Sequence, residues 1–501
     1  MTPHLATLTT TITPLSPEDA GEALFIAGIF LNDGKPVLTP SAAAFDGAHR
    51  GMITQAVEMG AFDARPGSTH YLMKCDAFPG GIALVGLGEM KAYTPKVFKQ
   101  CIAQSVRAFN WAPAQAYAAV EWLPPDMTPK AAARLFASTA LNALTERFTL
   151  KTKGTAKAKT AQIYWVDEDA SHKVEEGLKE GAITAEGMSI MRGLADLPGN
   201  ICTPSYLAEA VSNTAQGLAN IDVTVLDEHA IADLGMGAFL AVAQGSVVPP
   251  RFIAIRYRGA DEKAPEYALV GKGITFDAGG ISLKSAANMA DMTYDMSGAA
   301  AVIGTVMAMA KAQCPINLLG VVAACENLPS GSAAKPGDVV TSLSGKTIEI
   351  INTDAEGRMI LADALTWTAR QKPALMIDAA TLTSACGIAL GFPFTGLFTP
   401  DEALAEDLLK AGRDTLDEAW RLPVGADYLK QMETPAADLA NSAKVRQGGA
   451  SNAASFLSVF TEDVPWAHLD IAATANTSGR DRLSTGRPVP MLTRFLFKKM
   501  R

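Results

Sequence analysis

The sequence predicts an α/β fold of two domains, a smaller N-terminal one and a larger C-terminal one with a mixed, mostly parallel sheet covered by helices. The chain has 501 residues, more than one hydrophobic core usually supports. Hydrophobic residues make up 48% and charged residues 19%, as in a globular protein rather than a disordered one. Buried apolar runs alternate with helical patterns, which is typical of parallel sheets with helices on both faces.

In the first third, apolar runs predict strands and one helix. Residues 23–31 predict a strand that enters a tight Asn-Asp-Gly-Lys turn. Residues 82–85 predict a buried strand that ends in a Gly-Leu-Gly turn. Helical spacing marks 129–147, and a strand is expected at Gln162–Val166. The Lys-rich segment 151–159 contains little apolar material, so we expect an exposed loop there.

A long helical pattern joins the two predicted domains. It runs from about 174 to 197 and stops at a Pro-Gly-Asn sequence. We place the boundary after residue 175, so that 1–175 form the N-terminal domain and 176–501 the C-terminal domain. Residues 176–198 are then a connecting helix.

The second part of the chain is richer in Gly and Ala and alternates strand and helix patterns. In sheets built this way, ligands gather at the carboxyl ends of strands and the amino ends of helices. Buried strands are predicted at 252–257, 267–270, 316–323 and 374–378, with helices at 299–312 and 361–371.

Charge and cysteine usage narrow the class of protein. The net charge of −9 argues against general nucleic-acid binding. Six scattered cysteines without a Cys-x-x-Cys pair predict reduced, buried thiols and a cytoplasmic location. The first Lys or Arg is Lys35, so a secretory signal is not expected. The longest early apolar run has nine residues, too few to cross a bilayer.

Two polar clusters follow buried strands. The first spans 270–284 and continues to 296, and the second spans 352–358 ahead of an apolar helix. Together they bring four carboxylates to the ends of elements, and these would repel one another unless positive charge lies among them. Two divalent cations would supply it, and a carboxylate-rich, His-poor set suits Mg²⁺, Mn²⁺ or Zn²⁺. The carboxylates are Asp277, Asp295, Asp354 and Glu356.

Other interpretations of single residues stay open. For either cluster alone, Asp354 as a helix N-cap supported by Glu356 is about as well founded as a metal site. A Gly-x-Gly sequence is a weak dinucleotide signal because Phe276 stands where the third Gly belongs. The Gly-Lys-Thr sequence at 345–347 is interpreted as a hairpin turn, and His468 as structural rather than a ligand. The chain has no His-Glu-x-x-His motif, so a single-zinc protease is excluded.

Together, the two clusters resemble the leucyl aminopeptidase family, the M17 peptidases. The heptapeptide Asn-Thr-Asp-Ala-Glu-Gly-Arg at 352–358 matches that family's signature without change. The resemblance covers about residues 190–501, and the N-terminal part resembles the family's macro-like α/β domain in its layout. Further matching segments are 326–331, 335–338, 380–383 and 466–472.

The resemblance implies two divalent metal ions per subunit, Mn²⁺, Zn²⁺ or Mg²⁺. One site would be tight, with Lys272, Asp277, Asp295 and Glu356 as ligands. The other would exchange more readily, with Asp277, Asp354, Glu356 and the backbone carbonyl of Asp354. An amine ligand must be deprotonated, so the metal has to depress the pKa of Lys272.

The resemblance also implies the reaction: a water activated by the two metals removes the N-terminal residue, leucine-like by preference, from short peptides. Lys284 would stabilise the oxyanion, and Arg358 would hold a bicarbonate ion that acts as the general base. Ser384 stands where the family usually has Gly, and Ala475 where it often has a larger residue, which leaves the preferred residue open. The implied substrate-binding residues are Met292, Asn327, Thr381, Leu382, Ser384, Ala472 and Ala475.

The implied assembly is a homohexamer, a dimer of trimers with active sites facing an inner cavity, without membrane or nucleic-acid partners. One alternative is a catalytically weak relative that acts as a DNA-binding or structural hexamer. Another is a two-metal phosphatase or nuclease, which would also use clustered carboxylates but would not explain a lysine ligand.

Overall fold

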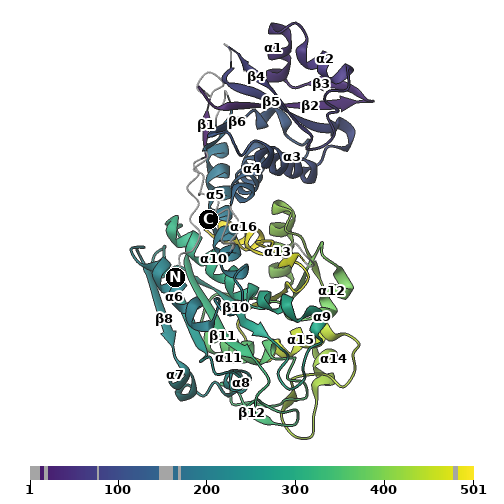
Figure 1. Cartoon of the computed structure of the whole chain (residues 1–501). Coiled ribbons are helices and arrows are strands. Elements are labelled where there is room, and N and C mark those ends of the chain that lie inside the picture. Colours follow the sequence, from purple (N-terminus) through teal and green to yellow (C-terminus); the bar gives the residue numbers. More distant parts are fainter. Residues whose placement is uncertain are drawn as a thin grey trace. The chain divides into compact units, whose positions relative to one another are not determined.

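The computed structural model divides into two compact units. We call them the N-terminal unit (Thr7–Glu186) and the C-terminal unit, which contains Gly187–Arg501. Both units contain mixed sheets with helices (Figure 1), so the predicted α/β class is confirmed. The structure describes residues 12–15, 21–75, 78–145, 150, 162–167, 171–477 and 483–500.

In the N-terminal unit, seven strands form one sheet. They are β1 (Ile12–Leu15), β2 (Leu24–Asn32), β3 (Lys35–Leu38), β4 (Thr69–Cys75), β5 (Phe78–Glu89), β6 (Ala114–Tyr117) and β7 (Gln162–Val166). The order is β1-β7-β6-β2-β5-β4, and β3 pairs with β2 as a hairpin. The helices are α1 (Pro40–Ala48), α2 (Met52–Glu58), α3 (Pro95–Ala108) and α4 (Pro129–Leu144).

Most N-terminal predictions are confirmed, with one correction. The strand and turn predicted from 23–31 form the β2–β3 hairpin, and β7 occupies its predicted residues. The turn predicted after 82–85 is wrong, because β5 continues to Glu89. A Cβ on Gly86 would lie 2.3 Å from the carbonyl oxygen of Arg65, so glycine lets the strand pass close to a neighbouring backbone. The loop predicted at 151–159 lies outside the described residues.

The predicted connecting helix corresponds to α5 (His172–Ala195), which ends three residues earlier than predicted and continues the chain from one unit into the other. The domain boundary after residue 175 stays a prediction. Among the residues that the structure describes, no helix is both long enough and apolar enough to span a bilayer.

The central sheet of the C-terminal unit has a parallel core with antiparallel flanks. Its strands are β8 (Ile221–Leu226), β9 (Arg251–Arg258), β10 (Glu266–Asp277), β11 (Asn317–Asn327), β14 (Leu375–Ala380), β15 (Thr395–Phe398), β16 (Ala419–Arg421) and β18 (Trp466–Asp470). The order is β16-β15-β18-β14-β10-β11-β9-β8. The neighbours β18, β14, β10 and β11 are parallel, so their carboxyl ends share one edge of the sheet.

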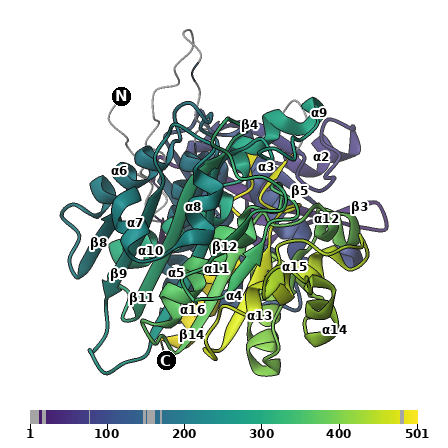
Figure 2. The same cartoon turned by 90° about the horizontal axis from the view of Figure 1, so that it is seen from below.

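Helices cover both faces of this sheet. One face is packed against α6 (Pro204–Ala215), α10 (Ser297–Lys311), α13 (Glu402–Thr415) and α16 (Val489–Lys499). The other is packed against α8 (Gly237–Ala243), α11 (Gly357–Ala369) and α15 (Gly449–Ser458). Figure 2 shows these elements from below. Every residue of β11 is buried, as expected for a strand covered on both faces.

Shorter elements complete the C-terminal unit and the connections. The short helices are α7 (Glu228–Asp233), α9 (Ala286–Met289), α12 (Ser384–Leu390) and α14 (Ala426–Leu429). The 3-10 helices are η2 (Met90–Ala92), η3 (Ala119–Trp122), η4 (Ala290–Tyr294) and η5 (Lys430–Met432). The remaining strands are β12 (Val339–Thr341), β13 (Thr347–Glu349), β17 (Leu439–Ala440), β19 (Asn476–Thr477) and β20 (Leu483–Ser484).

The predicted C-terminal elements are all present, and two details differ. The predicted strands overlap β9, β10, β11 and β14, and the predicted helices overlap α10 and α11, with ends that differ by one or two residues where a prediction runs past its element. The Gly-Lys-Thr turn joins β12 to β13. However, β10 extends to Asp277, so Lys272 and Asp277 lie in the strand and not after it. Asp354 as the helix N-cap is also wrong: α11 begins at Gly357, and Glu356 occupies the cap position without a side-chain cap bond.

Candidate active site

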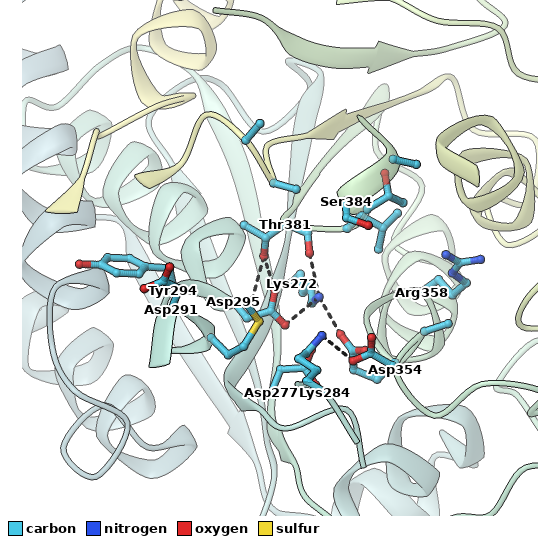
Figure 3. A pocket seen from close by; sticks show the side chains of 18 of the residues that line it. Lys272, Asp277, Lys284, Asp291, Tyr294, Asp295, Asp354, Arg358, Thr381 and Ser384 are labelled. Atoms are coloured by element: carbon cyan, nitrogen blue, oxygen red, sulfur yellow. Dashed lines mark hydrogen bonds and ion pairs between the residues drawn. The ribbon is translucent and has the colours of Figure 1, made fainter. Parts of the chain in front are cut away.

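A cavity of about 660 Å³ opens at the carboxyl edge of the parallel strands in the C-terminal unit. Both polar clusters of the sequence contribute to it, together with the segments that follow β14 and β18. Figure 3 shows the side chains of Lys272, Lys284, Asp277, Asp295 and Asp354 close together. The cavity is lined by all seven residues predicted to bind metal or to take part in catalysis: Lys272, Asp277, Lys284, Asp295, Asp354, Glu356 and Arg358.

Local backbone features place these groups. The chain turns sharply after β10 at Gly279 and Gly280, whose φ angles of 87° and 65° favour glycine. The turn returns Lys284 to the strand end, where its amide donates to the carbonyl oxygen of Ala278 at 2.9 Å. Asp295 caps the end of η4, and the second cluster lies in the turn before α11.

Lys272 is buried, with 2% of its surface exposed, and it lies between two carboxylates (Figure 3). Its Nζ is 2.8 Å from Oδ2 of Asp295 and 2.7 Å from Oε1 of Glu356. The same Nζ donates to the carbonyl oxygen of Thr381 at 2.9 Å. Burial disfavours the charged amine, but Asp295 and Glu356 outweigh this effect and raise the pKa of Lys272.

A missing side chain makes room for Lys272. A Cβ on Gly357, the first residue of α11, would lie 2.7 Å from Cε and 2.8 Å from Nζ of Lys272. Because the lysine is held at three oxygens, it could not move aside without losing those contacts. Glycine at this position is therefore a requirement of the lysine's placement.

Lys284 binds the other two carboxylates. Its Nζ is 2.8 Å from Oδ2 of Asp277 and 2.5 Å from Oδ1 of Asp354. Burial again opposes the charge, but Asp277 and Glu356 raise the pKa of Lys284. These carboxylates favour the protonated form of Lys284.

The four carboxylates carry more negative charge than the two ammonium groups neutralise. Burial is the main reason why the pKa values of Asp277, Asp295 and Asp354 lie above their ordinary range. For Asp277, the neighbouring Glu356 raises the pKa further. Additional positive charge at this place would relieve the repulsion.

The donor set fits divalent cations. Carboxylate oxygens of Asp277, Asp354 and Glu356 lie within 4.8 Å of one another. Oδ2 of Asp295 and Oδ1 of Asp354 are buried and touch an ammonium group, but neither receives a well-directed hydrogen bond within the described part of the chain. Such oxygens are the ligands that Mg²⁺, Mn²⁺ and Zn²⁺ accept.

Asn327 lies behind the carboxylates, not among the residues that line the main cavity. Its side-chain amide donates to Oδ1 of Asp277 at 2.8 Å and to the carbonyl oxygen of Thr353 at 3.0 Å. It lines a separate cavity of about 20 Å³. In this position it orients Asp277, which leaves the other carboxylate oxygen to face the centre.

Arg358 is a buried cation with unused donors. Its Nη1 donates to the carbonyl oxygen of Asn441 at 2.8 Å, and its Nε has no partner among the residues described. Burial lowers the pKa of Arg358 to about 10, so the guanidinium stays charged at neutral pH. Its place in the lining allows it to hold a small anion.

Most of the predicted substrate-binding residues line the cavity. Ala475 is fully buried and is absent from the lining. Figure 3 shows Thr381 and Ser384 on the side of Lys272 away from Asp277 and Lys284. The predicted residues in the lining are Met292, Thr381, Leu382, Ser384 and Ala472.

Sequence analysis missed several lining residues. Phe392 and Asn476 contribute to the cavity but stand outside both clusters, and no spacing in the sequence points to them. Asp291 also lines the cavity and lies in the continuation of the first cluster, but it is not among the predicted site residues. His468, predicted to be structural, is fully buried, and its Nδ1 lies 2.6 Å from Oδ1 of Asp378. It is absent from the lining, in agreement with a structural role.

Comparison with known proteins gives matches over nearly the whole chain. The model of the cytosol aminopeptidase family catalytic domain matches residues 189–493, and the model of the family's N-terminal domain matches 26–154. A probable cytosol aminopeptidase of Paraburkholderia phymatum is 44% identical over 482 residues, 95% of this chain and 94% of the relative. One of Bordetella petrii is 45% identical over 488 residues, 95% and 96% of the two chains.

Solved structures give the same picture. The bottromycin maturation enzyme BotP in complex with Mn superposes with a TM-score of 0.81 and 32% identity, covering 96% of this chain and 100% of that one. A mutant of tomato leucine aminopeptidase has a TM-score of 0.83 and 31% identity, with 98% and 97% covered.

Proposed function

The chain belongs to the cytosol aminopeptidase family, a family of metal-dependent hydrolases, and from this premise we propose that it uses two divalent cations to remove N-terminal residues from short peptides. Family membership establishes the aminopeptidase reaction and its peptide substrates. The number of cations, the general base and the preferred residue are parts of the proposal. The observation that carries it is the convergence of four carboxylates and two lysines on one cavity.

The proposed tight site uses Lys272, Asp277, Asp295 and Glu356, and the proposed exchangeable site uses Asp277, Asp354, Glu356 and the carbonyl of Asp354. Divalent cations there would lower the pKa of water and polarise the scissile carbonyl. As a ligand, Lys272 has to be neutral, and the carbonyl oxygen of Thr381 can still accept one of its hydrogens. Mn²⁺ is the first candidate because BotP was solved in complex with Mn.

The other cationic groups support the reaction around this centre. Lys284 reaches the cavity with a protonated amine, which would stabilise the negative oxygen that forms during hydrolysis. The centre would also bind the α-amino group of the substrate, and an internal peptide bond offers no such group. This explains removal of terminal residues only.

We propose that Arg358 holds a bicarbonate ion. The unpartnered Nε and the buried, charged guanidinium support an anion at this place. The bound anion would then supply the general base.

A leucine-like first residue is the proposed preference. Thr381, Leu382, Ser384 and Ala472 form a wall with apolar groups, which suits an aliphatic side chain. The side chain of Ser384 leaves less space in the pocket than glycine would. A homohexamer of this chain is a further proposal, supported by the family resemblance, and mass measurement in solution by light scattering tests it.

The main test is hydrolysis of leucine p-nitroanilide by the purified chain. We expect activity with added Mn²⁺, its loss after treatment with a chelator, and its return when Mn²⁺, Zn²⁺ or Mg²⁺ is restored one at a time. Elemental analysis should give two metal ions per chain. Hydrolysis of p-nitrophenyl phosphate instead of the amide would overturn the proposal.

The role of bicarbonate has a separate test. Activity in buffer stripped of carbon dioxide should be low and should rise when bicarbonate is added. The Arg358→Ala variant should lose this response and keep its metal. An equal bicarbonate response in wild type and variant would contradict the proposed anion site.

A further inference from the structure

Asp470, the last residue of β18, is buried beneath the cavity with 1% of its surface exposed. It lies beside Ala380, the last residue of β14, in the parallel sheet. Oδ1 accepts from the amides of Leu382 at 3.3 Å and Ala472 at 3.1 Å, and Oδ2 accepts from the hydroxyl of Thr383 at 2.7 Å. The carboxylate is therefore surrounded by donors.

All three donors belong to residues that line the substrate cavity. Leu382 and Thr383 follow β14, whereas Ala472 follows β18, so one carboxylate ties together the two segments that form the wall. The hydroxyl of Thr383 also accepts from the amide of Cys386 at 3.0 Å and caps α12. The position of Ser384, the first residue of that helix, depends on the same contact.

The segment held by Asp470 continues into the centre through Thr381. The carbonyl oxygen of Thr381 accepts from Nζ of Lys272 at 2.9 Å, and its hydroxyl donates to Oδ1 of Asp295 at 2.7 Å. Figure 3 shows both contacts. A shift of this segment would thus turn the amine of Lys272 and move a carboxylate of the centre.

We propose that Asp470 is a positioning residue: its carboxylate sets segment 381–384, and thereby both the orientation of the Lys272 amine and the shape of the pocket for the first side chain. This inference rests on the proposed function for its catalytic consequence. A carboxylate suits the task because two oxygens serve three donors. Alanine would leave those donors without a partner.

A second buried carboxylate provides the matched control. Asp363 on α11 is fully buried and accepts from the amides of Phe239 at 2.8 Å and Leu343 at 2.7 Å. It is absent from the cavity lining. Asp363→Ala removes a similar set of hydrogen bonds from the same unit, so it reports what the loss of a merely structural carboxylate does.

The test compares Asp470→Ala, Asp470→Asn and Asp363→Ala by kinetics and by hydrogen exchange. Asp470→Ala should lower kcat on the order of 100-fold, as misplaced catalytic groups do, and should change the preference for leucine over alanine. Asp470→Asn keeps one acceptor oxygen, and Thr383 can rotate to accept from its amide, so it should recover most of kcat. Asp363→Ala should lower thermal stability without changing kcat or the preference.

Hydrogen exchange decides the inference without any activity measurement. Amides in 381–384 should exchange faster in Asp470→Ala than in wild type or Asp363→Ala. If Asp470→Ala does not fold, Thr383→Val removes one donor, keeps the carboxylate and should show the same changes at smaller size. Unchanged exchange and preference in Asp470→Ala would overturn the inference, whereas an inactive wild type would overturn the proposed function.

Discussion

Buried carboxylates lie at two places along helix α11, and what surrounds them differs. Asp363, two turns into the helix, accepts hydrogen bonds from backbone amides of α8 and of the β12–β13 connection. At the start of the same helix, Glu356 and its neighbours face one another and share two ammonium groups. A carboxylate among neutral donors is part of the fold, whereas carboxylates that face one another need added cations.

The largest expected effect separates these two groups by function. Glu356→Gln keeps the shape of the side chain but removes a charge from the centre, and kcat/KM should fall by more than about 1,000-fold because the cation's contribution is lost. Metal content should fall as well. Without metal, the variant should melt no lower than metal-free wild type, because repulsion among the carboxylates is reduced. Asp363→Asn should retain wild-type kcat/KM. Kinetics, elemental analysis and thermal melting measure these effects. Loss of activity in Asp363→Asn but not in Glu356→Gln would contradict the separation of the two groups.

The next effect concerns stability and pH at Asp363. Burial raises the pKa of Asp363 from 3.8 to about 7, so the folded state binds a proton more tightly than the unfolded state. Its contribution to stability is therefore full below the unfolded pKa and is lost as pH rises through the folded one. The free energy of unfolding of wild type, minus that of Asp363→Asn, should fall by at most roughly 4 kcal/mol as the pH rises from 3.8 to about 7. Urea titrations at several pH values measure this difference, and a flat profile would contradict it.

A third effect concerns the ammonium groups among the carboxylates. Lys284→Ala should lower kcat by about 10² to 10³, the usual size for loss of an oxyanion-stabilising group, with metal content retained because Lys284 is not a proposed ligand. Lys335→Ala is the matched control, since that lysine is exposed and pairs only with Asp338 in the described structure. Equal losses in the two variants would rule out a catalytic role for Lys284.

The smallest expected effect concerns the pocket wall. Ser384→Gly removes a side chain from the lining and should raise kcat/KM for leucine relative to alanine substrates by about tenfold, the usual order for a change of one small group in a pocket. The alanine substrate serves as the internal control. A ratio that stays constant would place Ser384 outside the pocket for the first side chain.

Much of the fold and the centre could be predicted because the signals are local. Apolar runs such as 252–257 and 316–323 become β9 and β11 with small shifts of their ends. The carboxylate clusters follow strands whose carboxyl ends share one edge, so parallel topology brings Asp277 and Asp354 together from 77 positions apart in the numbering.

The rest depends on tertiary contacts that no local pattern encodes. The glycines after residue 85 indicated a turn, but the strand continues because another backbone lies against it. Asp354 is of a residue type that favours the N-cap position, yet the turn before α11 directs its side chain into the centre. Phe392 reaches the cavity from beyond α12, and Asp470 has its role only because β18 lies beside β14.

The absent side chain of Gly357 has a consequence for how this protein can change. Alanine is preferred to glycine inside helices by up to about 1 kcal/mol, but at the start of α11 its methyl group would occupy the space of the Lys272 amine. The buried lysine would then lose its contacts with Asp295 and Glu356, which costs more than the helix gains. Libraries screened only for heat resistance should therefore retain glycine there, so that selection for stability also preserves the chemistry of the centre.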